Sequence, residues 1–126
     1  MNLSKLDKRI VCDVDGTICF TEGGDYENSI PDVQFISHLN EYYENGFYII
    51  LFTSRNMNTF NGDLRQITRV TLPILQCWLN NNNCKYHELI IGKPWCGHSG
   101  FYIDDKAIRP AEFKDLTFEE ISQLIS

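Results

Sequence analysis

Two aspartates spaced by one residue, Asp13 and Asp15, end a short apolar run in the segment RIVCDVDGT. An aspartate at the end of a strand often caps a turn, but it can also act as a nucleophile or a metal ligand. A carboxylate beside a divalent cation can attack phosphorus, because the cation screens the repulsion between the incoming anion and the phosphoryl group. A second carboxylate two residues further on can protonate the leaving group and later take a proton from water. The pair therefore fits phosphoryl transfer, with Asp13 as nucleophile and Asp15 as acid and base.

Polar residues follow three further apolar runs. Thr53 and Ser54 follow FYIILF, Lys93 follows HELIIG, and Asp104 and Asp105 follow GFYI. Each residue alone has an ordinary explanation as a turn or cap residue. Together they are expected to converge on one crevice, because ligands of open α/β sheets bind beyond the carboxyl ends of the strands.

The four aspartates in this set require a cation, since two carboxylates about 4 Å apart repel by about 4 kcal/mol at an effective dielectric of about 20. Hard carboxylate oxygens suit Mg²⁺, which keeps waters and takes a phosphate oxygen as well. We therefore expect Mg²⁺ among Asp13, Asp15, Asp104 and Asp105. Thr53, Ser54 and the following amides would hold phosphoryl oxygens, and Lys93 would offset the charge of the transition state.

The elements that position these residues are expected to alternate along the chain. Unbroken apolar runs, typical of strands covered on both faces, lie at residues 9–13, 47–55, 87–92 and 100–105. Helices are expected over residues 31–45 with Ser29 as N-cap, from Thr71 to the asparagine run at 80–83, and after a Thr117–Glu120 capping box; residues 56–70 are expected to be loop with at most a short helix. This order predicts an α/β fold, a three-layer Rossmann-like arrangement around a mostly parallel sheet.

Length and charge limit the classes of protein. The 126 residues predict one domain over residues 1–126, and the net charge of −6 disfavours a nucleic-acid or anionic-membrane partner. A small phosphorylated substrate is still compatible, because local cations decide its binding. The apolar run near the N-terminus is too short for a signal segment or a membrane span, so a cytoplasmic protein is expected.

The five cysteines have no CxxC spacing, which favours free thiols in a reducing compartment. Cys84, His87, Cys96 and His98 could in principle gather around zinc, although their spacing fits no standard zinc motif. The alternative is that they are separate loop and core residues.

The ordered motifs resemble those of the haloacid dehalogenase (HAD) superfamily of phosphohydrolases. DVDGT is similar to its first motif, the Thr of FTSR to its second, the Lys of GKP to its third, and the acidic pair of YIDD to its fourth. The resemblance implies that Asp13 becomes an aspartyl-phosphate, that Asp15 is the acid and base, and that Thr53 and Lys93 bind phosphate. It also implies that Mg²⁺ is held by Asp13, the backbone carbonyl of Asp15, and Asp104. Asp105 would be either a further ligand or a partner of a ligand.

The short segment from IGKPWCG into GFYIDDKAIRPAEF resembles the small HAD phosphatases of capsule and lipopolysaccharide biosynthesis. That resemblance implies a sugar-phosphate substrate. No cap domain fits in the chain, and residues 18–30, with Gly23–Gly24, are expected to form a short β-hairpin flap. Capless members commonly cover their active sites with a neighbouring subunit, so a homo-oligomer, a dimer or tetramer, is expected.

Other functions remain open at this point. A phosphotransferase or mutase differs only in the acceptor of the phosphoryl group. A phospho-receiver domain has similar groups, but its acidic pair comes first, whereas here the acidic pair comes last. A silent phosphate-binding module would not need Asp15 two residues after Asp13.

Overall fold

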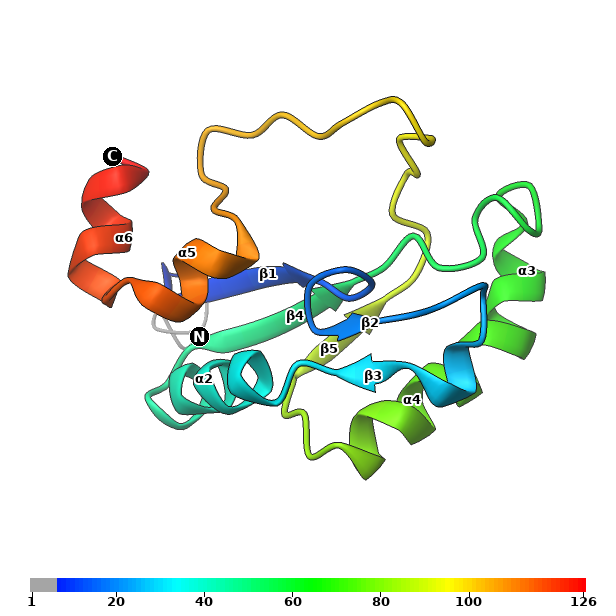
Figure 1. The fold of residues 1–126 in the computed structure, drawn as a ribbon, viewed down its shortest axis with the longest axis horizontal. Helices are drawn as coiled ribbons and strands as arrows, with labels where there is room; N and C mark the ends of the chain where they lie inside the picture. The colour runs from blue at the N-terminus through cyan, green and yellow to red at the C-terminus, as the bar shows by residue number, and fades with distance from the viewer. Residues whose placement is uncertain (1–6) are drawn as a thin grey trace. The chain divides into compact units, whose positions relative to one another are not determined.

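Three of the four expected strands form one parallel sheet in the computed structural model, which describes residues 7–126 (Figure 1). The strands are β1 (Arg9–Asp13), β4 (Tyr48–Phe52) and β5 (Glu88–Ile90), in the order β1-β4-β5. Arg9 lies opposite Tyr48 and Ile50 lies opposite Glu88. β-Branched and aromatic side chains favour strands because they pack well on a pleated surface. The prediction of an α/β fold with a parallel sheet is confirmed.

The fourth expected strand, residues 100–105, is not a strand. This segment has no regular secondary structure as far as Asp104 and then forms a turn, and its apolar side chains are exposed, Ile103 to 87%. An apolar run becomes a strand only when a neighbouring backbone completes its hydrogen bonds, and sequence pattern does not reveal that partner.

A short antiparallel pair follows the first strand, within the range expected for the hairpin. β2 (Cys19–Phe20) pairs with β3 (Ile30–Pro31), and a 3₁₀ turn, η1 (Tyr26–Asn28), lies between them. Phe20 lies opposite Ile30, and these two side chains are 61% and 62% exposed. The pair therefore carries two large apolar side chains to the surface.

Helix α2 (Val33–Glu44) ends at Asn45, as predicted, but begins later than expected. Its N-cap is Asp32, whose carboxylate accepts a hydrogen bond from the Phe35 amide at 3.0 Å, and not Ser29. The reason is that Ile30–Pro31 is engaged in β3, so the helix starts only after that strand.

The helical stretch before the third strand is also longer than expected. It runs through α3 (Leu64–Gln66), a π-helical turn η2 (Ile67–Thr71) and α4 (Leu72–Asn81), so part of the expected loop at 56–70 is helical. Proline lacks an amide hydrogen and crowds the carbonyl four residues earlier, which usually ends a helix. Here the wider π turn ends at Thr71, two residues before Pro73, and the helix continues through the proline.

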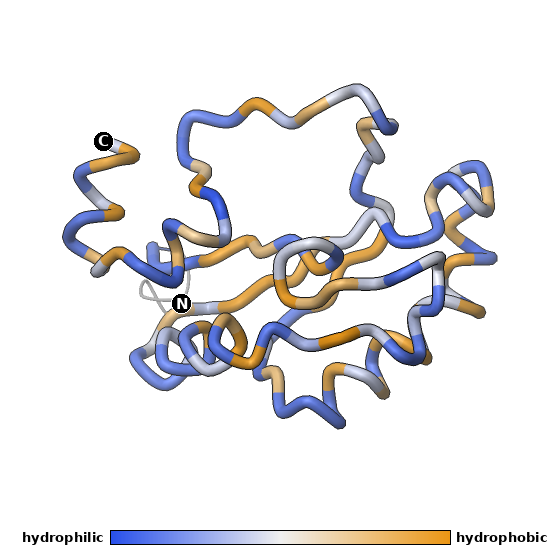
Figure 2. The backbone as a smooth tube through the Cα atoms, in the orientation of Figure 1, coloured by the Kyte–Doolittle hydropathy of each residue, from blue (hydrophilic) through white to orange (hydrophobic). Residues whose placement is uncertain are grey.

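The core of this part of the chain lies between the sheet and its helices. Strands β1 and β4 are among its hydrophobic segments (Figure 2). Fully buried side chains come from the sheet, from α2, from η2 and α4, and from the loop after β1; they are Val14, Ile18, Leu39, Ile49, Leu51, Ile67, Leu75 and Leu79. Burying one such side chain stabilises a protein by about 1.5–3 kcal/mol. Asp15, in the loop after β1, is therefore flanked along the chain by two buried side chains, Val14 and Ile18.

The described chain divides into two compact units, one extending to Trp95 and the other comprising Cys96–Ser126. The second unit contains α5 (Pro110–Asp115) and α6 (Phe118–Leu124). The predicted capping box of α6 is confirmed, because Thr117 accepts from the Glu120 amide and the Glu120 side chain accepts from the Thr117 amide. Among residues 7–126, no helix is both long and apolar enough to cross a membrane.

Candidate active site

The backbone brings Asp13, Thr53 and Lys93 to the same edge of the sheet. Asp13 ends β1 opposite Phe52, and Thr53 is the next residue after β4. The Thr53 amide donates to the carbonyl of Ile90 at 2.9 Å, and the Lys93 amide donates to the carbonyl of Thr53 at 3.0 Å. The parallel hydrogen-bonding pattern thus continues beyond β4 and β5, and it places Lys93 beside the end of β4.

The Asp13 carboxylate lies between an amine and a hydroxyl. Its Oδ1 is 3.1 Å from Nζ of Lys93, and its Oδ2 accepts a hydrogen bond from the Thr17 hydroxyl at 3.1 Å. Gly16 has a φ of +81°, a conformation that favours glycine and lets the chain reverse after Asp15. After this turn, the Thr17 hydroxyl binds the nucleophile candidate.

The Asp15 carboxylate makes a two-point ion pair with Arg55. Nε of Arg55 donates to Oδ2 at 3.0 Å, and Nη2 donates to Oδ1 at 2.8 Å. The Thr21 hydroxyl also donates to Oδ1 at 3.1 Å. Two parallel hydrogen bonds from an arginine to a carboxylate are stronger, and fix its orientation better, than a single hydrogen bond. Asp15 is therefore held in one orientation by a two-point contact, whereas the amine of Lys93 contacts Asp13 at a single oxygen.

Arg55 is the part of the site that the sequence did not reveal. From the sequence alone, an arginine at this position could reach a substrate or pair with a surface carboxylate. In the structure its side chain is buried, and its guanidinium carbon lies 4.2 Å from the centroid of the Tyr26 ring. The signal available was its place two residues after Thr53, but nothing in the sequence indicated its burial.

Thr53 is buried, and its hydroxyl accepts a hydrogen bond from the Arg55 amide at 3.0 Å. Ser54 is half-buried, and its carbonyl accepts from the Met57 amide at 3.0 Å. Thr53 therefore fixes the turn that directs Arg55 inward. Thr53 and Ser54 lie in the first unit, at the end of β4.

Asp104 and Asp105 lie in the second unit and are exposed. Oδ1 of Asp104 accepts a hydrogen bond from the Lys106 amide at 2.8 Å, which is the turn-capping role that any aspartate can take. Within residues 7–126, no three or more histidine, cysteine, aspartate or glutamate side chains are gathered closely enough to hold a metal ion.

Two members of the possible zinc set have structural roles. Cys84 is buried. Nδ1 of His87 accepts a hydrogen bond from the Ile49 amide at 3.0 Å, and its ring stacks on Tyr43 and on Tyr48 with ring centroids 4.5 Å apart in each case. His87 thus connects β4 with the start of β5. Cys96 and His98 belong to the second unit.

The Cys19 thiol adjoins the ion pair, with Sγ 3.6 Å from Oδ1 of Asp15. Burial raises the pKa of Cys19 to about 11, and the negative charge of Asp15 adds to this shift. Because of this raised pKa, Cys19 stays a neutral thiol near pH 7. A neutral thiol is only a weak nucleophile. Burial, followed by the charge of Asp15, also raises the pKa of Tyr26.

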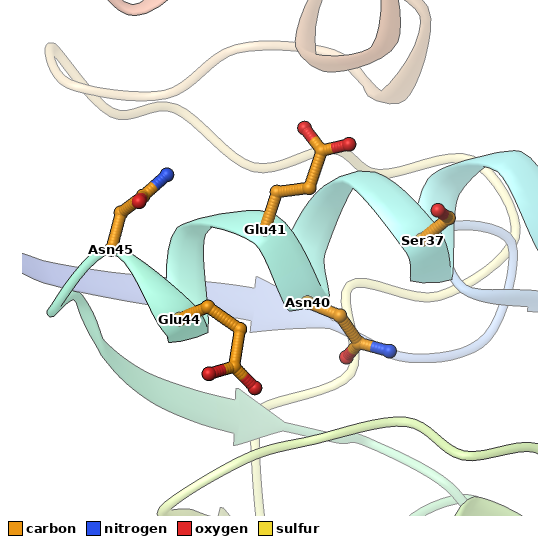
Figure 3. A pocket seen from close by; sticks show the side chains of 5 residues that line it. All are labelled: Ser37, Asn40, Glu41, Glu44 and Asn45. Carbon is orange, nitrogen blue, oxygen red and sulfur yellow. The ribbon is translucent and has the colours of Figure 1, made fainter.

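A shallow depression lies elsewhere, along α2 (Figure 3). It is lined by Ser37, Asn40, Glu41, Glu44 and Asn45, all from one helix and its C-cap. None of the candidate site residues lines it, and its two glutamates would repel a phosphorylated ligand. The chemistry described above belongs to the sheet edge.

Comparison with known proteins gives one relationship that covers nearly the whole chain. No family model and no curated protein matches it. A crystal structure of a structural-genomics target from Vibrio cholerae matches with 46% sequence identity and a TM-score of 0.91, covering 94% of this chain and 96% of the other. The chain therefore belongs to the same protein family as this Vibrio cholerae protein.

Proposed function

We propose that this protein is a Mg²⁺-dependent phosphomonoester hydrolase that works through an aspartyl-phosphate on Asp13. The observation that supports this most directly is the contact between the Asp13 carboxylate and Nζ of Lys93 at 3.1 Å. A carboxylate beside a lysine at the carboxyl ends of parallel strands can attack a phosphoryl group whose charge the lysine offsets. Asp15 follows two residues later in the same loop.

The proposed reaction has two steps. An oxygen of Asp13 attacks phosphorus, the bond from phosphorus to the ester oxygen breaks, and Asp15, which carries a proton at the start of this step, gives it to that oxygen. Asp15 then takes a proton from a water molecule, which attacks the aspartyl-phosphate and releases inorganic phosphate. Lys93 stays beside Asp13, and Thr53 and Ser54 bind phosphoryl oxygens in this proposal.

The donors present in the first unit fit Mg²⁺. A carboxylate offers about four acceptor positions, and the Asp13 contacts with Lys93 and Thr17 use two of them. We propose that Asp13, the carbonyl of Asp15, and Asp104 hold the ion, with Asp105 either as a further ligand or next to one. The roles of Asp104 and Asp105 in this proposal are inferred from the sequence. When bound, Mg²⁺ supplies charge compensation between the carboxylate and the phosphoryl group.

The test is phosphate release with Mg²⁺ over a panel of sugar phosphates, nucleotides and glycolytic esters. Asp13→Asn is expected to abolish release, because the amide is not a nucleophile, while Asp115→Asn, at an exposed position at the end of α5, serves as control. Turnover in Asp13→Asn at the level of the wild type would refute the nucleophile. Transfer to an added alcohol without free phosphate would identify a phosphotransferase or mutase instead.

Substrate and setting follow from the resemblance and are part of the proposal. We expect a small sugar phosphate from surface polysaccharide synthesis, acted on by a three-layer Rossmann-like domain in which residues 18–30 serve as the flap. The five free cysteines support a cytoplasmic location.

A homo-oligomer is also part of the proposal, and the exposed Phe20–Ile30 pair supports it, since such pairs often mark interfaces. Analytical ultracentrifugation should give a lower molecular mass for Phe20→Glu than for the wild type. An unchanged mass would remove this surface from the interface.

A further inference from the structure

Arg55 is a charged side chain with almost no access to solvent. The residue is 3% exposed and its side chain 0%. Burying a charge is costly unless a partner and hydrogen bonds compensate for it. The partners of Arg55 therefore show which contacts compensate for its burial.

The strongest of those partners is Asp15. Arg55 donates two hydrogen bonds to the Asp15 carboxylate, at 3.0 and 2.8 Å, while its own Nη1 is buried without a hydrogen-bond partner. The planar guanidinium matches a carboxylate at two points, which fixes the plane of the carboxylate as well as its position. Lysine could offer the charge but not this geometry.

The segment between β2 and β3 holds the same pair from the other side. The Tyr26 ring lies against the guanidinium, and the Thr21 hydroxyl donates to Oδ1 of Asp15. Thr21 also shares a hydrogen bond of 2.6 Å with the Ser29 hydroxyl. The Ser29 carbonyl in turn accepts from the Trp78 indole at 2.9 Å, which ties the segment to α4.

We propose that Arg55 is the positioning residue for Asp15, and that Tyr26 keeps Arg55 in place. This inference rests on the proposed function. Arg55 acts on the reaction through the carboxylate that it orients, with no contact of its own to the substrate. The ion pair sets the direction from which Asp15 meets the leaving-group oxygen and, later, the attacking water.

The role can be separated from a general loss of structure by choice of substrate. p-Nitrophenolate leaves without needing a proton, so the attack of Asp13 on p-nitrophenyl phosphate does not depend on Asp15. Hydrolysis of the aspartyl-phosphate still needs Asp15 as a base. A misplaced Asp15 should therefore slow the second step and leave the first intact.

The experiment compares Arg55→Lys with the wild type in rapid-mixing kinetics with Mg²⁺ and p-nitrophenyl phosphate. Arg65→Lys, an exposed arginine in α3, is the matched control. In Arg55→Lys we expect a burst of about one p-nitrophenolate per enzyme, followed by a kcat about 100-fold lower, as for a misplacement of about 1 Å. KM should fall with kcat, because the phosphorylated enzyme accumulates. A purely structural role would lower burst amplitude and kcat together.

Two results would overturn the proposal. One is a kcat of Arg55→Lys within about twofold of the control, and the other is a burst that falls in proportion to kcat. If Arg55→Lys does not fold, Tyr26→Leu decides, since it keeps Arg55 and removes the ring against it; an unchanged kcat in that variant refutes the proposal. Should the wild type itself release no phosphate, or Asp13→Asn match it, the proposed function fails instead.

Discussion

Two carboxylates only two residues apart have different surroundings in this protein. Asp13 faces a lysine amine and a threonine hydroxyl. Asp15 faces a buried guanidinium that binds both of its oxygens. The surroundings differ because Lys93, which follows β5, reaches Asp13, whereas Arg55, which follows β4, reaches Asp15. A carboxylate beside a single amine suits a nucleophile, and a carboxylate held at both oxygens suits an oriented proton-transfer group.

At this scale we predict that Lys93→Met lowers kcat/KM for phosphate release by about 100-fold or more, because the charge beside Asp13 is lost. Lys85→Met is the matched control, since Lys85 forms an exposed ion pair with Glu44 on the surface. Steady-state phosphate release with Mg²⁺ measures both variants. Equal losses in the two would show that Lys93 contributes only general charge.

The buried Cys84 thiol gives a prediction about pH. Burial, with a smaller effect from Cys19, raises the pKa of Cys84 to about 12, whereas an unfolded cysteine titrates at about 8.5. The raised value means that the stabilising contribution is complete below about pH 8.5 and is lost as the pH rises toward about 12, by at most about 1.4 kcal/mol per pH unit. Urea unfolding measures the free energy of unfolding at pH 8 and at pH 10.5. The decrease between these two pH values should be smaller for Cys84→Ala than for the wild type. Identical losses would contradict the assignment.

Among the elements, His87 links two strands through its side chain. His87→Phe keeps an aromatic ring between Tyr43 and Tyr48 but removes the acceptor for the Ile49 amide, which belongs to a fully buried residue. Leaving a buried donor without a partner costs about 1–3 kcal/mol. We therefore expect a loss of about this size in the free energy of unfolding, measured with urea. His98→Phe, on the exposed surface of the second unit, should lose less, and equal losses would rule out this role.

The elements also show how far sequence reasoning extends. Long apolar runs predicted β1, β4 and β5, and parallel strands bring their carboxyl ends together, which is why Asp13 and Lys93 meet. The predicted helix boundaries were less accurate. Ile30–Pro31 forms a short strand where a helix was expected to begin, and a π turn precedes the part of the helix that contains Pro73. These outcomes depend on tertiary partners that local pattern does not contain.

The same limit applies to the missing strand and the hidden arginine. Residues 100–103 have the composition of a strand, yet strand formation needs a neighbouring backbone in addition to composition. Arg55 follows a predicted strand, but its burial depends on Asp15 and Tyr26, which lie 40 and 29 positions earlier in the chain. Pairings of this kind become visible only in three dimensions.

For the whole molecule we predict that millimolar Mg²⁺ raises the melting temperature of the wild type by about 2 °C or more, because it binds the folded state and relieves carboxylate repulsion there. Asp13→Asn should show a smaller shift, since one ligand loses its charge, while Asp115→Asn should behave as the wild type. Thermal unfolding followed by fluorescence measures all three. A wild type insensitive to Mg²⁺ would argue against a preformed metal site.

The parallel pairing of β1 with β4 also has a consequence for how the chain is made. Because the partners of residues 9–13 are residues 48–52, β1 has no strand to pair with until about forty more residues have left the ribosome. The nascent segment RIVC must remain unpaired during that interval, when apolar strands are most open to aggregation. The closure of this long loop, and with it the placement of the two aspartates, thus cannot precede the emergence of residue 52, and a chaperone that binds short apolar segments would act before that point.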